Sequence, residues 1–254
     1  MDVATVIPFY QDWKFWSFVV SGIAVLLSQL PPVQILIRPK KLDVEVHSRI
    51  NVTHQIGNPN VGLHISLGNS GGRELRVTGL KLNMQKDGKE LVSLPAQNYF
   101  ESPSNKTSVL FVPFSLKPDE YWSHSVNFLN FFDRATEKIY RYSATSLKLG
   151  IQKKLRDRPE QDNNNVKGEE DLVKPFLELF DRLFIWEPGE YIFELVVDSL
   201  PSSSTFSKKY RFTLFESDTK ELKEHTKDYQ FGGGPIYTVD SHVGLFIAIS
   251  EHYG

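Results

Sequence analysis

The 254-residue chain contains no cysteine. This absence excludes disulfide bonds, thiolate catalysis, cysteine-ligated zinc and iron–sulfur clusters, and it agrees with a domain in the cytoplasm. An excess of one charge is also lacking, because 29 Lys and Arg stand against 31 Asp and Glu. No basic stripe of the kind that binds nucleic acid emerges from the sequence, so we expect no nucleic-acid partner.

Catalytic signatures are missing as well. The seven histidines show neither an HExxH motif nor His-x-x-x-His spacing, and no GxSxG nucleophile elbow occurs. His54 and His64 follow the solvent phase of a strand pattern, and Glu224, His225 and Asp228 indicate a charged helix surface. We therefore predict a protein that is not an enzyme and has neither metal nor cofactor. Several histidines converging in a deep pocket would favour an enzyme instead.

Only one long apolar run is present. Residues 15–30 (FWSFVVSGIAVLLSQL) carry no formal charge, and residues 33–37 extend the run beyond two prolines. A membrane span needs about 20 predominantly apolar residues, so we predict a transmembrane helix over residues 15–37 with a kink at Pro31 and Pro32. A cleaved signal peptide is the alternative, but its basic leading segment and small-residue cleavage site are missing.

Basic residues flank this run unequally, with one lysine before it and three basic residues directly after it. The positive-inside rule therefore predicts an extracytoplasmic N-terminus (residues 1–14) and a large cytoplasmic domain. The expected location is the inner (cytoplasmic) membrane of a bacterium, crossed once. The residues predicted at the membrane interfaces are Trp13, Trp16, Arg38, Lys40 and Lys41.

Small residues recur along one face of the expected span. Ser17, Ser21, Ala24 and Ser28 are spaced four, three and four residues apart, which aligns them on a helix. Such a face lets two helices approach closely, so we expect self-association or docking on a partner's membrane helix. The alternative is that serine and alanine are simply common in short spans.

After residue 42 the apolar pattern changes to a period of two, which is typical of half-buried strands. Residues 75–82 alternate with a slip at Gly79 that indicates a bulge, and Asp87-Gly88 predicts a tight hairpin. The long stretch 120–185 is expected to hold a helical insertion and a polar loop. Residues 236–240 and 243–250 are expected to form strands, the second of them buried.

The segment Trp186–Val197 (WEPGEYIFELVV) has a Pro-Gly turn, then a tyrosine, then an alternating strand. It resembles the tyrosine corner of immunoglobulin-like and fibronectin III-like sandwiches, at the level of the superfamily. The resemblance covers residues 42–116 and 186–216. It implies a mainly β fold, an antiparallel sandwich over 42–254, in which Gly189 forms the turn and the Tyr191 hydroxyl bonds back to the backbone. Such sandwiches generally serve as binding or spacer modules.

Phenylalanines gather around the expected insertion. Phe131, Phe132, Phe180 and Phe184 are candidates for an exposed patch that docks a protein partner, because aromatic residues dominate binding energy. The alternative is that they pack the insertion onto the sandwich.

Together these features predict a non-enzymatic, membrane-anchored interaction protein whose cytoplasmic sandwich recruits or senses a protein partner. A membrane-acting effector that oligomerises through its span is the second hypothesis. An envelope protein with the sandwich outside the cell is the third.

Overall fold

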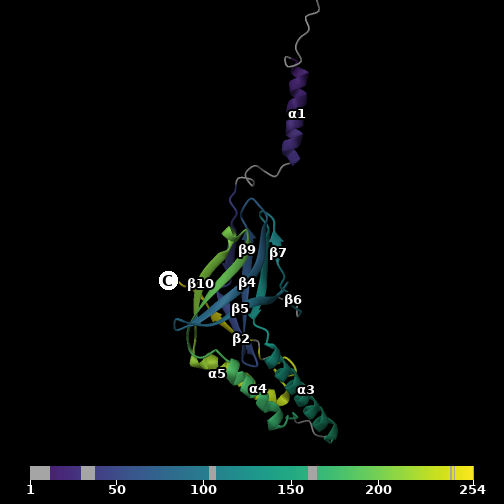
Figure 1. Ribbon diagram of the computed structural model, residues 1–254, viewed down its shortest axis with the longest axis vertical. Helices are drawn as coiled ribbons and strands as arrows, with labels where there is room; N and C mark the ends of the chain where they lie inside the picture. The colour runs from purple at the N-terminus through teal and green to yellow at the C-terminus, as the bar shows by residue number, and fades with distance from the viewer. Residues whose placement is uncertain are drawn as a thin grey trace, which may run out of the picture.

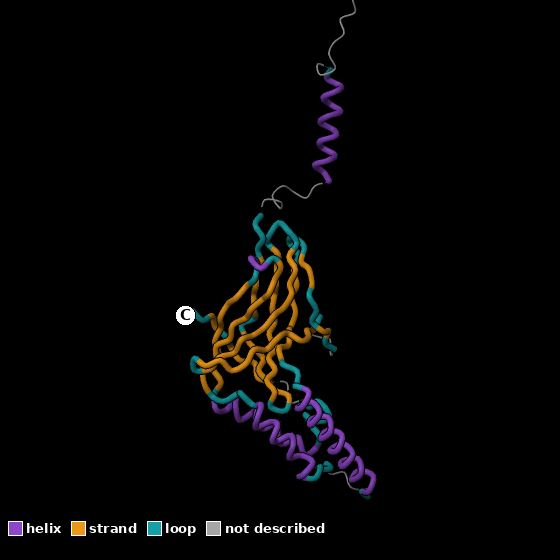
Figure 2. The backbone as a smooth tube through the Cα atoms, in the orientation of Figure 1, coloured by secondary structure: helices purple, strands orange, loops and turns teal. Residues whose placement is uncertain are grey.

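The computed structural model describes residues 12–29, 38–102, 107–159, 165–240, 242 and 244–253. Within them the fold is mainly β, antiparallel and barrel-like, and the α-helices that follow residue 133 are gathered at one end of the strands (Figures 1 and 2). The strands are β1 (Leu42–Val46), β2 (Arg49–Gln55), β3 (Asn58–Asn69), β4 (Leu75–Lys86), β5 (Lys89–Phe100), β6 (Val109–Leu110), β7 (Phe114–Leu116), β8 (Tyr121–Leu129), β9 (Gly189–Leu200), β10 (Phe206–Leu214), β11 (Leu245–Ala248) and β12 (Ser250–Glu251).

Two segments carry the sheet around its corners. One half of the sheet contains β11, β2, β3 and β8, and the other contains β4, β9, β10 and β12. β5 pairs with β4 over residues 89–95 and with β8 over residues 96–100, so this strand belongs to both halves. At the opposite edge, β11 pairs with β2, and β12 then pairs with β10. Hydrogen bonds therefore join the two halves along both edges, which makes the sheet barrel-like.

The alternation expected from the sequence is present in the central strands. The inward positions of β9 are all buried, and β4 shifts register between Val77 and Gly79, as the predicted bulge requires. Asp87 and Gly88 both have positive φ (51° and 75°), which is the geometry of a two-residue type I′ hairpin. The side chains buried along β4 and β9 are Leu75, Val77, Leu80, Leu82, Met84, Tyr191, Phe193, Leu195, Val197 and Ser199.

The helical part consists of α3 (Arg134–Asp157), α4 (Glu170–Leu183), α5 (Glu216–Glu224) and the 3₁₀ segment η3 (His225–Phe231). Asp133 caps α3, because its Oδ1 accepts a 2.7 Å hydrogen bond from the Thr136 amide. Residues 121–129, at the start of the stretch 120–185, form β8, and the helices of this stretch begin at Arg134. Residues 160–164 of the expected polar loop lie outside the described residues.

The C-terminal segment differs from the expectation. Residues 236–240 form no strand beyond an isolated bridge between Gly233 and Tyr237, because Gly232 and Gly234 adopt positive φ (both 88°) and fold the chain back on itself. β11 is not buried, and Phe246 is 65% exposed. The strand pairs beside β2 in the sheet and presents one face to solvent.

Tyr191 makes the backbone contacts that the resemblance implies. Its hydroxyl lies 2.7 Å from the Glu187 carbonyl and 2.8 Å from the Ile185 carbonyl, so the start of β9 is tied to the preceding turn. Gly189 has φ +147°, and a Cβ there would lie 2.8 Å from Lys86 Cε. The positive φ favours glycine, whereas the flexible end of the Lys86 side chain can move aside.

We expect Tyr191→Phe to lower the free energy of unfolding by about 1–3 kcal/mol, because two carbonyls lose the donor that the buried Tyr191 side chain supplies. Urea denaturation of the full chain in detergent measures this loss. Tyr210→Phe is the matched control, since the Tyr210 ring stacks on Phe193 in the same core. Equal losses in the two variants would contradict a structural role for the Tyr191 hydrogen bonds.

Candidate functional site

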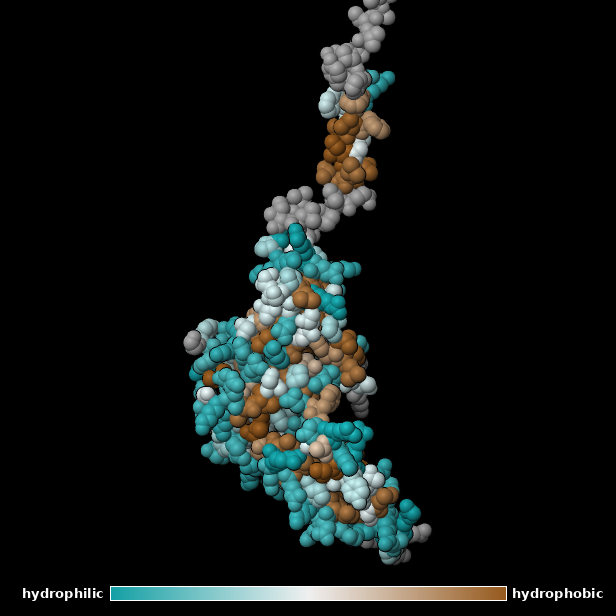
Figure 3. Space-filling view, viewed as in Figure 1, coloured by the Kyte–Doolittle hydropathy of each residue, from teal (hydrophilic) through white to brown (hydrophobic). Residues whose placement is uncertain are grey.

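The helix α1 (Trp13–Gln29) covers part of the expected membrane span. It stands apart from the sheet in Figure 1, and apolar side chains cover most of the face shown in Figure 3. Val20, Ile23 and Leu26 are at least half exposed. In the part of the chain that the structure describes, no helix is both long and apolar enough to cross a membrane. Residues 1–11 and 30–37 of the expected N-terminus and span lie outside the described residues.

The residues expected to pack the span and to flank it are placed as follows. Ser17, Ser21, Ala24 and Ser28 lie on α1, and the Ser28 hydroxyl donates to the Val25 carbonyl at 2.7 Å within the same helix. Trp13 and Trp16 are exposed at its start. Arg38 pairs with Asp119 at 2.9 Å and Lys41 pairs with Asp43 at 2.9 Å, while Lys40 is exposed.

The four phenylalanines do not form one exposed patch. Phe131 is exposed, but Phe180 is buried and Phe132 packs against Tyr140. Phe184 is half-buried, with its ring 4.7 Å from that of Phe180. The idea of a shared docking patch is therefore wrong for Phe180, because the apolar stripe of α4 packs against the β2–β3 turn.

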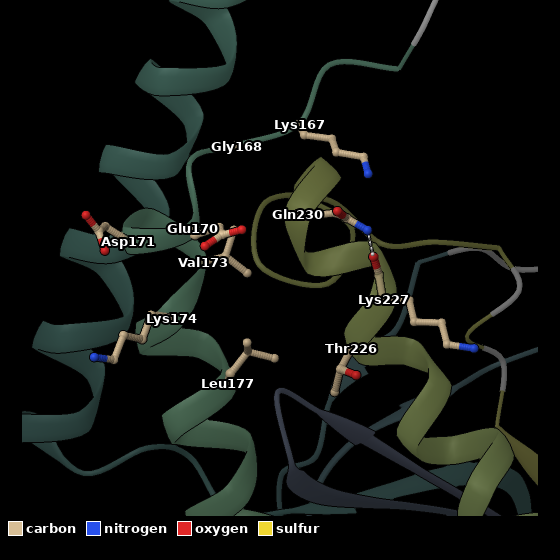
Figure 4. Close-up of a pocket in the computed structure, with 10 residues that line it drawn as sticks. All are labelled: Lys167, Gly168, Glu170, Asp171, Val173, Lys174, Leu177, Thr226, Lys227 and Gln230. Atoms are coloured by element: carbon tan, nitrogen blue, oxygen red, sulfur yellow. Dashed lines mark hydrogen bonds between the residues drawn. The ribbon is translucent and has the colours of Figure 1, made fainter.

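A cleft of about 620 Å³ lies between α4 and η3 (Figure 4). Val173 and Leu177 provide its apolar side chains. Lys174 and Lys227 point away from each other on opposite sides in Figure 4. The charged groups of the cleft therefore do not converge on one point, and we assign no ligand to it.

A second, smaller pocket of about 280 Å³ brings three histidines together, and we call it the histidine pocket. The ring centroids of His54 and His225 are 5.1 Å apart, and those of His225 and His242 are stacked at 3.9 Å. The residues that define this pocket are His54, Asn60, His225, Tyr229, Thr238 and His242.

His54 connects the sheet to the helices. Its Nδ1 accepts a 3.1 Å hydrogen bond from the Gly57 amide, so the ring proton lies on Nε2 and is donated to the Leu222 carbonyl at 2.9 Å. His64 is elsewhere, exposed between Ser123 and Ser125. The expectation that His54 is a solvent-facing residue is wrong, because α5 and η3 cover the end of β2 where it stands.

His242 is oriented by an acid, since its Nε2 lies 2.9 Å from Asp228 Oδ2. His225, expected on a charged surface, is buried instead and its Nδ1 has no hydrogen-bond partner. No nucleophile is paired with any of these rings among the described residues.

Burial lowers the pKa of His54 to about 4, although its bond to the Leu222 carbonyl opposes this effect. Burial also lowers the pKa of His225 to about 4, and His242 and His54 lower it further while Asp228 raises it. Both rings are therefore neutral near pH 7. Burial raises the pKa of Tyr229, which keeps its hydroxyl protonated.

No family model matches the chain, and no curated protein sequence matches it either. Among the described residues, no group of three histidine or acidic side chains is arranged to hold a metal ion. The site therefore has to be interpreted from its own geometry. Sequence reasoning missed it because its residues come from β2, β3, η3 and the following loop, which no local pattern brings together.

We expect the protein to lose stability as the pH falls from about 6.5 towards 4. The folded-state pKa values of His54 and His225 lie below the unfolded value, so unfolding takes up protons in this window. Each histidine should contribute a slope of about 1.4 kcal/mol per pH unit in the middle of the window.

Urea denaturation of the wild-type chain and of His225→Phe, repeated from pH 8 to pH 4.5, measures this slope. The variant should show a shallower slope below about pH 6 and the wild-type slope above pH 7. Identical slopes throughout would show that His225 stays equally protonated in the folded and unfolded chain.

Proposed function

We propose that this protein is a membrane-anchored interaction module, in which α1 is the anchor and the barrel-like domain recruits or senses a protein partner. The single observation that carries this proposal is the exposure of apolar side chains along α1. Exposed apolar area costs about 25 cal/mol per Å², so a helix of this composition is far more stable in an apolar environment than in water. Membrane lipid supplies that environment.

The length of α1 bears on how the anchor is placed. Its 17 residues extend about 25 Å, whereas the hydrocarbon core is about 30 Å thick. Anchoring across the membrane therefore requires residues beyond Gln29 or a locally thinner bilayer. Arg38, Lys40 and Lys41 follow closely and favour a cytoplasmic domain.

The domain itself supports a role in binding. The hydrogen bonds of Tyr191 support a relation to immunoglobulin-like sandwiches, which generally serve as binding modules. Anchoring would raise the effective concentration of the domain near a membrane partner without any new contact.

We expect the full-length chain to stay with the membrane fraction after washes with high salt and alkaline carbonate. The double variant Val20→Lys and Leu26→Lys should move to the supernatant, since each central charge opposes insertion by about 2.5–3.5 kcal/mol. Ile139→Lys with Leu149→Lys is the matched control, because it places the same charges on exposed apolar positions of α3. Wild-type chain in the washed supernatant would refute the anchor.

The competing effector hypothesis requires the face of Ser17, Ser21, Ala24 and Ser28 to assemble helices. Ser21→Leu with Ala24→Leu should leave membrane retention, particle size and any co-purifying partner unchanged if α1 is a simple anchor. Sizing in detergent and mass spectrometry measure these quantities. Loss of an oligomer would favour the effector, and cleavage of the domain by protease added to spheroplasts would favour the envelope protein.

A further inference from the structure

We propose that the histidine pocket binds a small uncharged polyhydroxy compound, of the size of a monosaccharide or a cyclitol. No residue of α1 lines this pocket, so the inference extends the proposed function to the sensing of a small molecule.

Unpaired polar groups on three residues that line the pocket carry the inference. Asn60 Oδ1, His225 Nδ1 and the Tyr229 hydroxyl are all buried and have no hydrogen-bond partner. Tyr229 is 1% exposed and His225 is 8% exposed. Leaving one buried polar group unpaired costs about 1–3 kcal/mol, so three at one pocket form an arrangement that a ligand can stabilise.

The chemistry of these groups defines the ligand. Asn60 Oδ1 needs a donor, whereas a tyrosine hydroxyl both donates and accepts, and neutral His225 can do either at Nδ1. Hydroxyl groups meet all three needs at once, because each is both a donor and an acceptor.

Charge argues against an ionic ligand. Of the described residues that line the pocket, none is Lys, Arg, Asp or Glu. The nearest acid, Asp228, is already engaged by His242, and the single ring proton of His54 is donated to Leu222. A buried charge without a partner is costly, so the pocket selects against charged molecules.

The size and the entrance fit a small molecule. Water occupies about 30 Å³ per molecule in the liquid, so a pocket of 280 Å³ exceeds the space of one or two ordered waters. His54, His225 and Tyr229 form the buried part, whereas Gln55 and Thr238 are exposed and stand at the solvent side. The loop that carries Thr238 is attached to η3 by the contact between His242 and Asp228.

The test uses full-length protein in detergent with glycerol, D-glucose and myo-inositol as uncharged probes. D-gluconate and D-glucose 6-phosphate are the charged comparators. Side-chain NMR of ¹⁵N-histidine-labelled protein follows His225 during titration, and thermal unfolding gives an independent measure of binding. Tyr229→Phe removes the unpaired hydroxyl and keeps the ring. Tyr210→Phe is the matched control, because Tyr210 is also buried but stacks on Phe193 in the core of the sheet and does not line this pocket.

We expect saturable binding of at least one uncharged probe, with the His225 resonances shifted and the charged comparators at least about tenfold weaker. Tyr229→Phe should weaken binding about tenfold or more, and Tyr210→Phe should not. No saturation by any probe at about 50 mM would overturn the proposal and identify the pocket as a site for ordered water only. Unchanged binding by Tyr229→Phe, or equal binding of the charged compounds, would overturn it as well.

Discussion

The fully buried indole of Trp186 joins the sheet to the helices. Its Nε1 donates to the Thr53 carbonyl on β2 at 2.8 Å, and its own carbonyl accepts from the Thr219 hydroxyl on α5 at 2.9 Å. Its ring lies 5.7 Å from that of Tyr191, whose hydroxyl fixes the start of β9. One residue therefore sets the positions of β2, β9 and α5 relative to each other, and the helical end of the barrel depends on that relation.

The histidine pocket follows from the same junction. Because α5 is held against the end of β2, the Leu222 carbonyl oxygen lies 2.9 Å from His54 Nε2. This contact buries the histidine. η3 continues directly from α5 and brings His225 and Tyr229 to the same place. On the other side, α4 packs so tightly on the β2–β3 turn that a Cβ on Gly57 would lie 2.6 Å from the Phe180 carbonyl oxygen. The pocket is thus built by helix packing on one sheet corner.

Local sequence patterns predicted those parts of the fold that depend on neighbouring residues in the chain. The Asp87-Gly88 hairpin, the bulge at Gly79 and the tied turn before Tyr191 each follow from a few adjacent residues. The burial of His54 could not be predicted, because the covering element lies some 168 residues away in the chain. The closure of the barrel by β11 and β12 could not be predicted for the same reason, because their partner strands are distant in sequence. Nor could the burial of Phe180 be predicted, because the apolar stripe of its helix could equally have faced a partner.

The strand β3 also separates the point where the chain enters the domain from the histidine pocket. The chain enters the domain beside Gly71, next to the Asn69 end of β3, whereas the helices pack at its Asn58 end. Twelve residues of strand extend about 40 Å. With α1 in a membrane, the histidine pocket therefore lies at the end of the barrel farthest from the point of attachment. A small molecule could reach it from the aqueous phase without passing the membrane surface, and a response to that ligand would arise where α3, α4 and η3 are exposed to a partner.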